Sequence, residues 1–200
     1  MKDNNPLFDN REFWDRRYAD NPALGSGIGS RGENLLHKRK IIEGFLERVA
    51  PSSVLDVGCG DHEVLRDVAC LPGYVGLDVS GVVVARNRQT FPQRRFECVD
   101  FVACSDLEPL RADVVLCTEV LIHQHRREQF DGLLKNIVAA AVKGGLVSGY
   151  MFDPRPTIAS DIIAWHEPIT DALLRSGAKS VGVEARSLET DCLAFVSFLI

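Results

Sequence analysis

The stretch VLDVGCGD, from Val54 to Asp61, is an apolar run that leads directly into two closely spaced glycines. Its first four residues have the composition of a buried strand, and a helix-forming segment follows it. Gly58 and Gly60 let the backbone turn sharply between the two elements, and a ligand can approach the main chain there without meeting a Cβ atom. The stretch therefore predicts a strand, a ligand-binding turn and a helix, which together begin a βαβ unit.

Short β-branched runs alternate with amphipathic stretches from residue 53 onward. This alternation is typical of an α/β fold with a Rossmann-like, doubly wound and mostly parallel sheet. Seven strands are expected, at 53–58, 73–78, 94–98, 112–117, 144–151, 179–185 and 191–199. Helices are expected at 61–70, 80–90, 126–142 and 158–176, with a loop at 101–111.

The last two expected strands, AKSVGVEARS and DCLAFVSFLI, are separated by only Leu188, Glu189 and Thr190. A connection of this length is too short for a helical crossover, so the two strands must run antiparallel. The sheet is therefore expected to end in an antiparallel C-terminal hairpin.

Residues 1–50 precede the sheet and are expected to form a helical cap or lid of the same domain, whereas residues 51–200 form the ligand-binding domain. The elements expected in this cap are an amphipathic stretch at 12–18, a Gly/Ser loop at 25–32 and a helix at 33–49. GIGSRG, residues 27–32, spells the dinucleotide pattern G-x-G-x-x-G, but no strand precedes it. This loop is either a flexible connector or a lid whose amides and Arg31 contact an anionic ligand.

The composition restricts the classes of partner. The chain has 200 residues, 46% of them hydrophobic, and a net charge of −5, so it lacks the basic surface that nucleic-acid binding requires. No apolar run approaches the roughly 20 residues needed to cross a bilayer, and the opening MKDNNPLFDN is too polar for a secretory signal. The six cysteines show no C-x-x-C spacing, which fits a reducing compartment. We therefore expect a cytoplasmic protein without nucleic-acid or membrane partners.

A second acidic residue, Asp78, ends the expected strand in YVGLDVS, 22 positions after Asp56 (78 minus 56). A carboxylate at the tip of the second parallel strand lies beside the first βα turn, where it can accept hydrogen bonds from both hydroxyls of a ribose. Taken alone, a glycine turn with an acid also fits a nicotinamide dinucleotide site.

Three further features accompany this turn: VDF at 99–101, TEVLIH at 118–123 and the terminal hairpin. With these features at their observed spacing, the chain resembles the class I S-adenosylmethionine-dependent methyltransferases over about residues 50–200. The resemblance implies S-adenosyl-L-methionine as the cofactor and S-adenosyl-L-homocysteine as the product.

The resemblance also implies a role for each stretch: the glycine loop holds the amino acid end of the cofactor, Asp78 the ribose, and Asp100 the adenine amino group. The implied cofactor-binding residues are Asp56, Gly58, Cys59, Gly60, Asp78, Val79, Asp100, Phe101, Cys117, Thr118 and Glu119. The commonest form of the loop has a third glycine where this chain has His62. Its side chain either points away from the ligand or narrows the pocket.

Methyl transfer is an in-line displacement, so the protein must orient the acceptor and, for an oxygen nucleophile, receive its proton. His123 lies just beyond the fourth strand and is the candidate base, although it equally fits a hydrogen-bonded wall residue. His125 lies two positions on, but two histidines alone leave a metal site short of ligands, so no metal is expected. The candidate acceptor contacts are Arg31, His123, Asp153 and Arg155, the last two being alternatively ordinary turn residues.

The expected acceptor is a small molecule or a saccharide, methylated most simply at a hydroxyl group. Two other activities remain open: methylation of nitrogen or carbon, and a methyltransferase-like subunit that binds cofactor without independent catalysis. The alternative from outside this family is an oxidoreductase that uses a nicotinamide dinucleotide.

Overall fold

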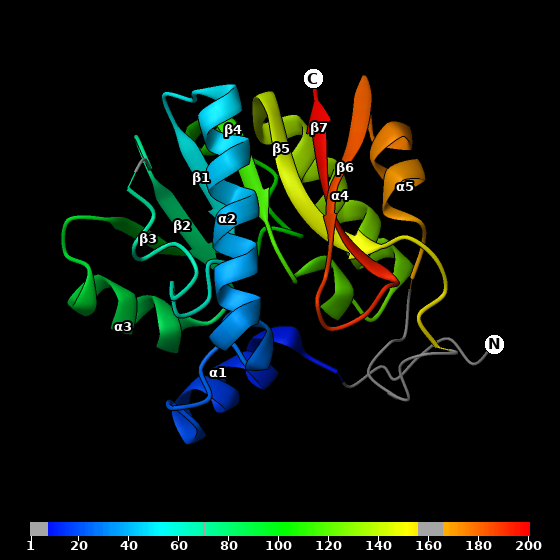
Figure 1. Ribbon diagram of the computed structural model, residues 1–200. Helices are drawn as coiled ribbons and strands as arrows, with labels where there is room; N and C mark the ends of the chain where they lie inside the picture. Colours follow the sequence, from blue (N-terminus) through cyan, green and yellow to red (C-terminus); the bar gives the residue numbers. More distant parts are fainter. Residues whose placement is uncertain (1–7, 70, 156–165) are drawn as a thin grey trace.

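The computed structural model describes residues 8–69, 71–155 and 166–200, which form one seven-stranded sheet flanked by helices (Figure 1). The sheet has the order β3-β2-β1-β4-β5-β7-β6, with β7 antiparallel to both of its neighbours and the remaining pairs parallel. The strands are β1 (Val54–Val57), β2 (Val75–Asp78), β3 (Arg95–Cys98), β4 (Ala112–Cys117), β5 (Ala141–Tyr150), β6 (Ser180–Arg186) and β7 (Leu193–Leu199). The predicted doubly wound sheet and its antiparallel C-terminal hairpin are confirmed.

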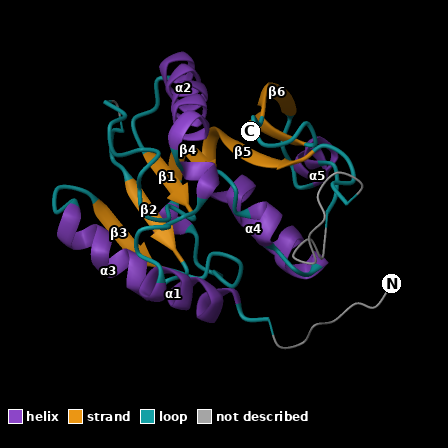
Figure 2. Cartoon of the chain, turned by 60° about the horizontal axis from the view of Figure 1, so that its bottom comes forward, coloured by secondary structure: helices purple, strands orange, loops and turns teal. Residues whose placement is uncertain are grey.

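Helices cover both faces of the sheet (Figure 2). Their bounds are α1 (Asn10–Asp20), α2 (Gly32–Val49), α3 (Gly81–Thr90), α4 (Arg127–Ala140) and α5 (Ile169–Arg175), with 3-10 turns η1 (Ile28–Ser30), η2 (Glu108–Leu110) and η3 (Leu121–His123). One apolar core joins the sheet to α4 and α5, and another joins its opposite face to α2 and α3. Because both faces are buried, the central strands are apolar throughout, and Asp56 stands out among them.

The helix expected at 61–70 does not form, and residues 61–67 instead make a series of turns, residue 70 lying outside the described part. His62 has a φ of 61°, in the left-handed region, and one such residue stops a right-handed helix from propagating. The expectation of a regular helix directly after the glycine loop was therefore wrong.

Two other helix boundaries differ from the expectation. The helix expected at 158–176 lies partly at 156–165, outside the described residues, and in the described part it begins only at Ile169. Pro168 precedes it, and a proline disfavours helical backbone at the residue before it. The helix expected at 126–142 ends at Ala140, because the chain passes directly into β5, where Ala141 pairs with Ala112.

The N-terminal segment packs along the sheet domain at two places. α1 lies beside α3 (Figure 2), where Asp15 accepts hydrogen bonds from Ser80 Oγ at 2.6 Å and from the Val82 amide at 3.3 Å. α2 runs along the terminal hairpin, with Arg48 paired to Glu184 at 2.5 Å. These contacts hold α1 and the loop after it over the carboxyl ends of the central strands.

Substitution of two glycines by alanine is expected to change the stability of the protein in opposite directions. A Cβ at Gly145, on β5, would overlap the Val115 carbonyl oxygen and the Phe198 ring, whereas a Cβ at exposed Gly44, within α2, meets nothing within 4 Å. We expect Gly145→Ala to lower the free energy of unfolding by about 1–3 kcal/mol. Gly44→Ala is expected to raise it by about 0.5–1 kcal/mol. Urea denaturation of both variants measures these changes, and a Gly145→Ala protein as stable as the wild type would contradict the packing of β5 against β4 and β7.

Candidate functional site

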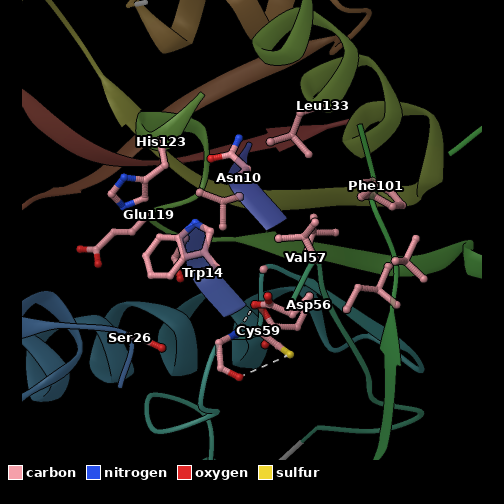
Figure 3. Close-up of a pocket in the computed structure, with 18 of the residues that line it drawn as sticks. Asn10, Trp14, Ser26, Asp56, Val57, Cys59, Phe101, Glu119, His123 and Leu133 are labelled. Atoms are coloured by element: carbon pink, nitrogen blue, oxygen red, sulfur yellow. Dashed lines mark hydrogen bonds between the residues drawn. The ribbon is translucent and has the colours of Figure 1, made fainter. Parts of the chain in front are cut away.

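A cavity of about 860 Å³ opens at the carboxyl ends of β1 to β4, within the size range of small-molecule sites. Figure 3 shows side chains from three regions around it: Asp56 and Cys59 from the glycine turn, Glu119 and His123 from beyond β4, and Trp14 from α1. The switch of strand order between β1 and β4 lies here, which is where open α/β sheets bind ligands.

The glycine turn forms the floor of this cavity. Gly58 and Gly60 have φ values of 75° and 52°, which a residue with a side chain rarely adopts. The amides of Gly58 and Cys59 both donate to the Leu77 carbonyl at 2.8 Å, so the turn is anchored to β2. A Cβ at Gly60 would overlap Ser26 Oγ, which brings the N-terminal segment directly onto the turn.

Asp78 lies at the end of β2 beside this turn. Its carboxylate accepts hydrogen bonds from the Gly60 amide at 3.0 Å and from the Ser80 amide at 2.9 Å. Burial raises the pKa of Asp78 to about 6, although these two amides oppose the change. Val79, which follows Asp78, also lines the cavity.

The third expected acid, Asp100, also lines the cavity, with Phe101 buried beside it. Asp100 accepts hydrogen bonds through one oxygen, from the Val102 amide at 3.1 Å and the Ala103 amide at 3.4 Å. These contacts fix the carboxylate at the edge of the cavity and leave its other oxygen available to a donor.

The segment after β4 forms the opposite wall. Thr118 and Glu119 line the cavity, whereas Cys117 is fully buried beneath them. Glu119 has a φ of 60°, and such a conformation in a residue other than glycine is typical of functional sites. Its carboxylate forms an ion pair with buried Lys38 of α2, which ties this wall to the N-terminal segment.

His123 closes the same wall, in the 3-10 turn η3. Trp14 packs edge-on against its imidazole, with ring centroids 5.3 Å apart. Burial, together with the nearby charge of Arg17, lowers the pKa of His123 to about 4, so the ring is neutral at pH 7. Within the described part of the chain neither ring nitrogen has a hydrogen-bond partner, so the nitrogen that carries no hydrogen in the neutral ring can accept a proton from a ligand.

Three predicted acceptor contacts lie elsewhere. Arg31 pairs with Asp61 at 2.5 Å and so binds the glycine turn from the lid side. Asp153 and Arg155 pair with each other at 2.6 Å, and Asp153 lines a separate hollow together with His166. The structure therefore brings His123 into the cavity but leaves Asp153 and Arg155 outside it.

The other histidine of this segment, His125, packs its ring on Phe8, with centroids 3.7 Å apart. Among residues 8–69, 71–155 and 166–200, no group of three or more His, Cys, Asp or Glu side chains is arranged to hold a metal ion. No helix in these same ranges is long and apolar enough to cross a bilayer.

Several lining residues were missed from the sequence because they lie in α1, directly after η3 and in α4. Asn10, Gln124 and Gln129 all line the cavity, and each has a buried side-chain carbonyl oxygen without a hydrogen-bond partner among the described residues. The orientation of Gln124 is fixed, because its amide nitrogen donates to the Val120 carbonyl at 3.0 Å. Buried acceptors without partners are costly unless a bound donor satisfies them.

A seven-stranded sheet with a terminal antiparallel hairpin, and a glycine turn beside a strand-end carboxylate, define the class I methyltransferase fold. Residues 55–147 match the protein family described as "Methyltransferase domain". The recognition of this class from the sequence is therefore confirmed. A comparison with curated protein sequences gives no match.

Solved structures with the same fold span nearly the whole chain. N-methyltransferase NodS from Bradyrhizobium japonicum WM9, in complex with S-adenosyl-L-homocysteine, is 17% identical with a TM-score of 0.72, over 96% of this chain and 98% of that one. Magnesium protoporphyrin IX methyltransferase from Synechocystis PCC 6803, with the same product bound, is 16% identical with a TM-score of 0.69, over 94% and 96%. An amino pentose methyltransferase from Micromonospora echinaspora, bound to S-adenosylmethionine, is 15% identical with a TM-score of 0.70, over 86% and 94%.

Asp61 is the residue that docks the lid on the glycine turn. Its carboxylate accepts hydrogen bonds from the Ser26 amide at 3.1 Å and the Ser26 hydroxyl at 2.9 Å, besides pairing with Arg31. Burial alone would raise the pKa of Asp61. The hydrogen bonds from Arg31 and Ser26 and the positive charge of Arg31 outweigh this effect and hold the pKa below its usual range. The Asp61 carboxylate is therefore ionised at neutral pH.

We expect Asp61→Asn to loosen residues 25–31, because the amide cannot pair with the Arg31 charge. Hydrogen exchange of these backbone amides at pH 7 should become about fivefold faster, which corresponds to about 1 kcal/mol of local stability. Glu184→Gln removes an ion pair at the other end of α2 and is the control, expected to leave exchange at 25–31 unchanged. Unchanged exchange in Asp61→Asn would show that the lid does not depend on this carboxylate.

Proposed function

We propose that the protein is an S-adenosylmethionine-dependent methyltransferase that transfers a methyl group to a hydroxyl of a small molecule or saccharide. The observation that carries this proposal is a single cavity lined by the glycine turn, by Asp78 and by His123. The cofactor supplies an electrophilic methyl group, and the residues of this chain bind it, orient the acceptor and receive the acceptor's proton.

The chain's own residues fit each part of this cofactor. Asp56 suits the ammonium group at the amino acid end of the cofactor, and Asp78 has lone pairs left for ribose hydroxyls after its two amide hydrogen bonds. Asp100 with Phe101 suits the adenine ring and its amino group. Two bound examples of this fold, NodS and the porphyrin enzyme, hold the product S-adenosyl-L-homocysteine.

The acceptor side combines an aromatic wall with polar groups. Trp14 offers a flat apolar surface, while Asn10, Gln124 and Gln129 offer carbonyl oxygens that need donors. A molecule with several hydroxyl groups supplies such donors, which favours a saccharide or another polyol as acceptor. Trp14, Asn10 and the 3-10 turn η1 come from the N-terminal segment, so the lid forms part of the acceptor site.

His123 is the group that would take the acceptor's proton. It is neutral at pH 7 because its pKa is lowered to about 4, and its ring nitrogens are not engaged by another described residue. A neutral imidazole is in the protonation state that can take the acceptor's proton while the new bond forms.

The first test is to incubate the protein with isotope-labelled S-adenosylmethionine and pools of small metabolites and saccharides. Mass spectrometry should find a product that gains one labelled methyl group, and fragmentation should locate the methyl on oxygen. Binding of the cofactor without any labelled product would favour the cofactor-binding subunit instead.

With an acceptor known, His123→Asn is expected to lower kcat by about 10²–10⁴-fold, the usual contribution of a positioned base. The dissociation constant of S-adenosyl-L-homocysteine should stay the same, because His123 lies on the acceptor side. His37→Asn is the matched control, since that imidazole instead contacts the Arg186 carbonyl on the far side of α2. For the wild type at saturating cofactor, kcat should fall only as the pH approaches the His123 pKa of about 4.

Methylation of an amine is the second candidate. Glu119 and Glu189 both approach Gly29 of the N-terminal segment, and among the described residues the buried Lys38 pairs with Glu119. Burial and the charge of Glu119 raise the pKa of Glu189, as expected where negative charge is in excess. A cationic amine would relieve that excess, and a fully active His123→Asn variant would favour this reaction over O-methylation.

A further inference from the structure

A chain of hydrogen bonds runs behind the glycine turn and ends on Asp56. Tyr74 donates its hydroxyl hydrogen to Asp56 Oδ2 over 2.8 Å, and the Tyr74 oxygen lies 3.1 Å from His62 Nδ1. The other imidazole nitrogen, Nε2, contacts the Arg94 guanidinium. The four residues come from β1, the segment after the glycine turn and the residues before β2 and β3, so the chain links four parts of the fold.

The direction of these hydrogen bonds follows from the donors. A guanidinium has only donors, so His62 Nε2 must accept from Arg94. An imidazole that accepts at one nitrogen carries its hydrogen on the other, so Nδ1 donates to the Tyr74 oxygen. The Tyr74 hydrogen is then free for Asp56, and every bond points toward the carboxylate. Burial lowers the pKa of His62 to about 3, in agreement with a neutral ring.

The surrounding residues leave room for this chain. Gly76 is the β2 partner of Asp56 in the sheet, and a Cβ there would lie 2.7 Å from the Tyr74 hydroxyl oxygen. His62 holds its left-handed φ of 61°, which costs conformational energy in a residue other than glycine. A glycine at this position would avoid that cost but would break the chain.

Asp56 needs such support because its surroundings oppose its charge. Burial raises the pKa of Asp56 to about 7, the Tyr74 hydrogen bond lowers it, the charge of Asp78 raises it and that of Arg94 lowers it. The titratable and charged groups that face Asp56 are Tyr74, Asp78, Arg94, Cys59 and Cys117. The Cys59 and Cys117 thiols have raised pKa values and stay neutral. The positive charge of Arg94, together with the hydrogen bonds through His62 and Tyr74, is therefore what favours the ionised form of Asp56.

We propose that this one-way chain is a positioning device: it keeps the Asp56 carboxylate ionised and fixed in orientation for the cationic ammonium group of the cofactor. The inference rests on the proposed cofactor site and adds three residues to it, none of which needs to touch the cofactor. Binding then favours the ionised form of Asp56, so near pH 7 the protein releases protons as the cofactor binds.

Calorimetric titration with S-adenosyl-L-homocysteine, from about pH 5.5 to 8.5 in two buffers of different ionisation enthalpy, tests this device. The affinity of the wild type should rise with pH through about 7, with proton release on binding. In Tyr74→Phe the last hydrogen bond is lost, and the midpoint should move up by about one pH unit. The dissociation constant at pH 7 should rise about fivefold, and the difference should narrow at about pH 8.5. His62→Gly, which suits the left-handed backbone, should shift the midpoint in the same direction.

Tyr150→Phe is the matched control, because this buried tyrosine lies at the end of β5, outside the cavity lining. It should leave both the affinity and the midpoint unchanged. If Tyr74→Phe and His62→Gly weaken binding equally at every pH, without a shift of the midpoint, the two residues act only by packing and the inference is overturned. If the wild type does not bind S-adenosyl-L-homocysteine at any pH, the cofactor site itself is wrong, which is a different failure from a midpoint that does not move.

Discussion

Two carboxylates buried side by side at the edge of an apolar sheet are the constraint on which the site depends. Asp56 and Asp78 end neighbouring parallel strands, and both are less than 10% exposed, at 6% and 8%. Taking such charges out of water is expensive, and burial raises the pKa values of both, to about 7 and about 6. The fold offsets part of this cost with the Gly60 and Ser80 amides on one acid and the Tyr74 hydroxyl on the other. The negative potential that remains is suited to a cationic ligand, and such perturbed acids are typical of functional sites.

The same interactions that hold these acids also attach the N-terminal segment. Ser80 donates its amide to Asp78 and its hydroxyl to Asp15 of α1, so one residue joins Asp78 to the N-terminal segment. Asp61, directly after the glycine turn, accepts from Ser26 and pairs with Arg31. The lid is thus connected to the floor of the cavity by acids on either side of the turn. The floor of the cavity and the N-terminal segment are therefore joined through Ser80, Ser26 and Arg31.

The parts of the fold that follow from periodic patterns were predictable from the sequence. The apolar runs predicted all seven strands, and the short connection between β6 and β7, residues 187–192, favours an antiparallel pair. The candidate site was predictable where a residue type is tied to a strand end, as for Asp78 and His123. Asp153 and Arg155 also follow a strand, but β5 is ten residues long and they pair with each other beyond it. The polar lining from Asn10 and Gln129 was missed, because contacts between helices distant in sequence leave no local pattern.

The turns at 61–67 accommodate His62, which stands where the commonest form of the loop has a third glycine. A helix there would satisfy its own carbonyl groups, and its absence leaves several of them to be paired in another way. The Glu63 and Val64 carbonyls accept from Arg39 of α2, at 3.1 and 3.0 Å. The Leu65 and Arg66 carbonyls accept from Arg94, at 3.0 and 3.3 Å. Two arginines therefore replace one helical turn, and one of them is the guanidinium that contacts His62. Arg94 thus contacts both His62, which stops the helix, and two of the carbonyl groups that a helix would have paired. The local backbone and the hydrogen-bond chain to Asp56 therefore depend on each other.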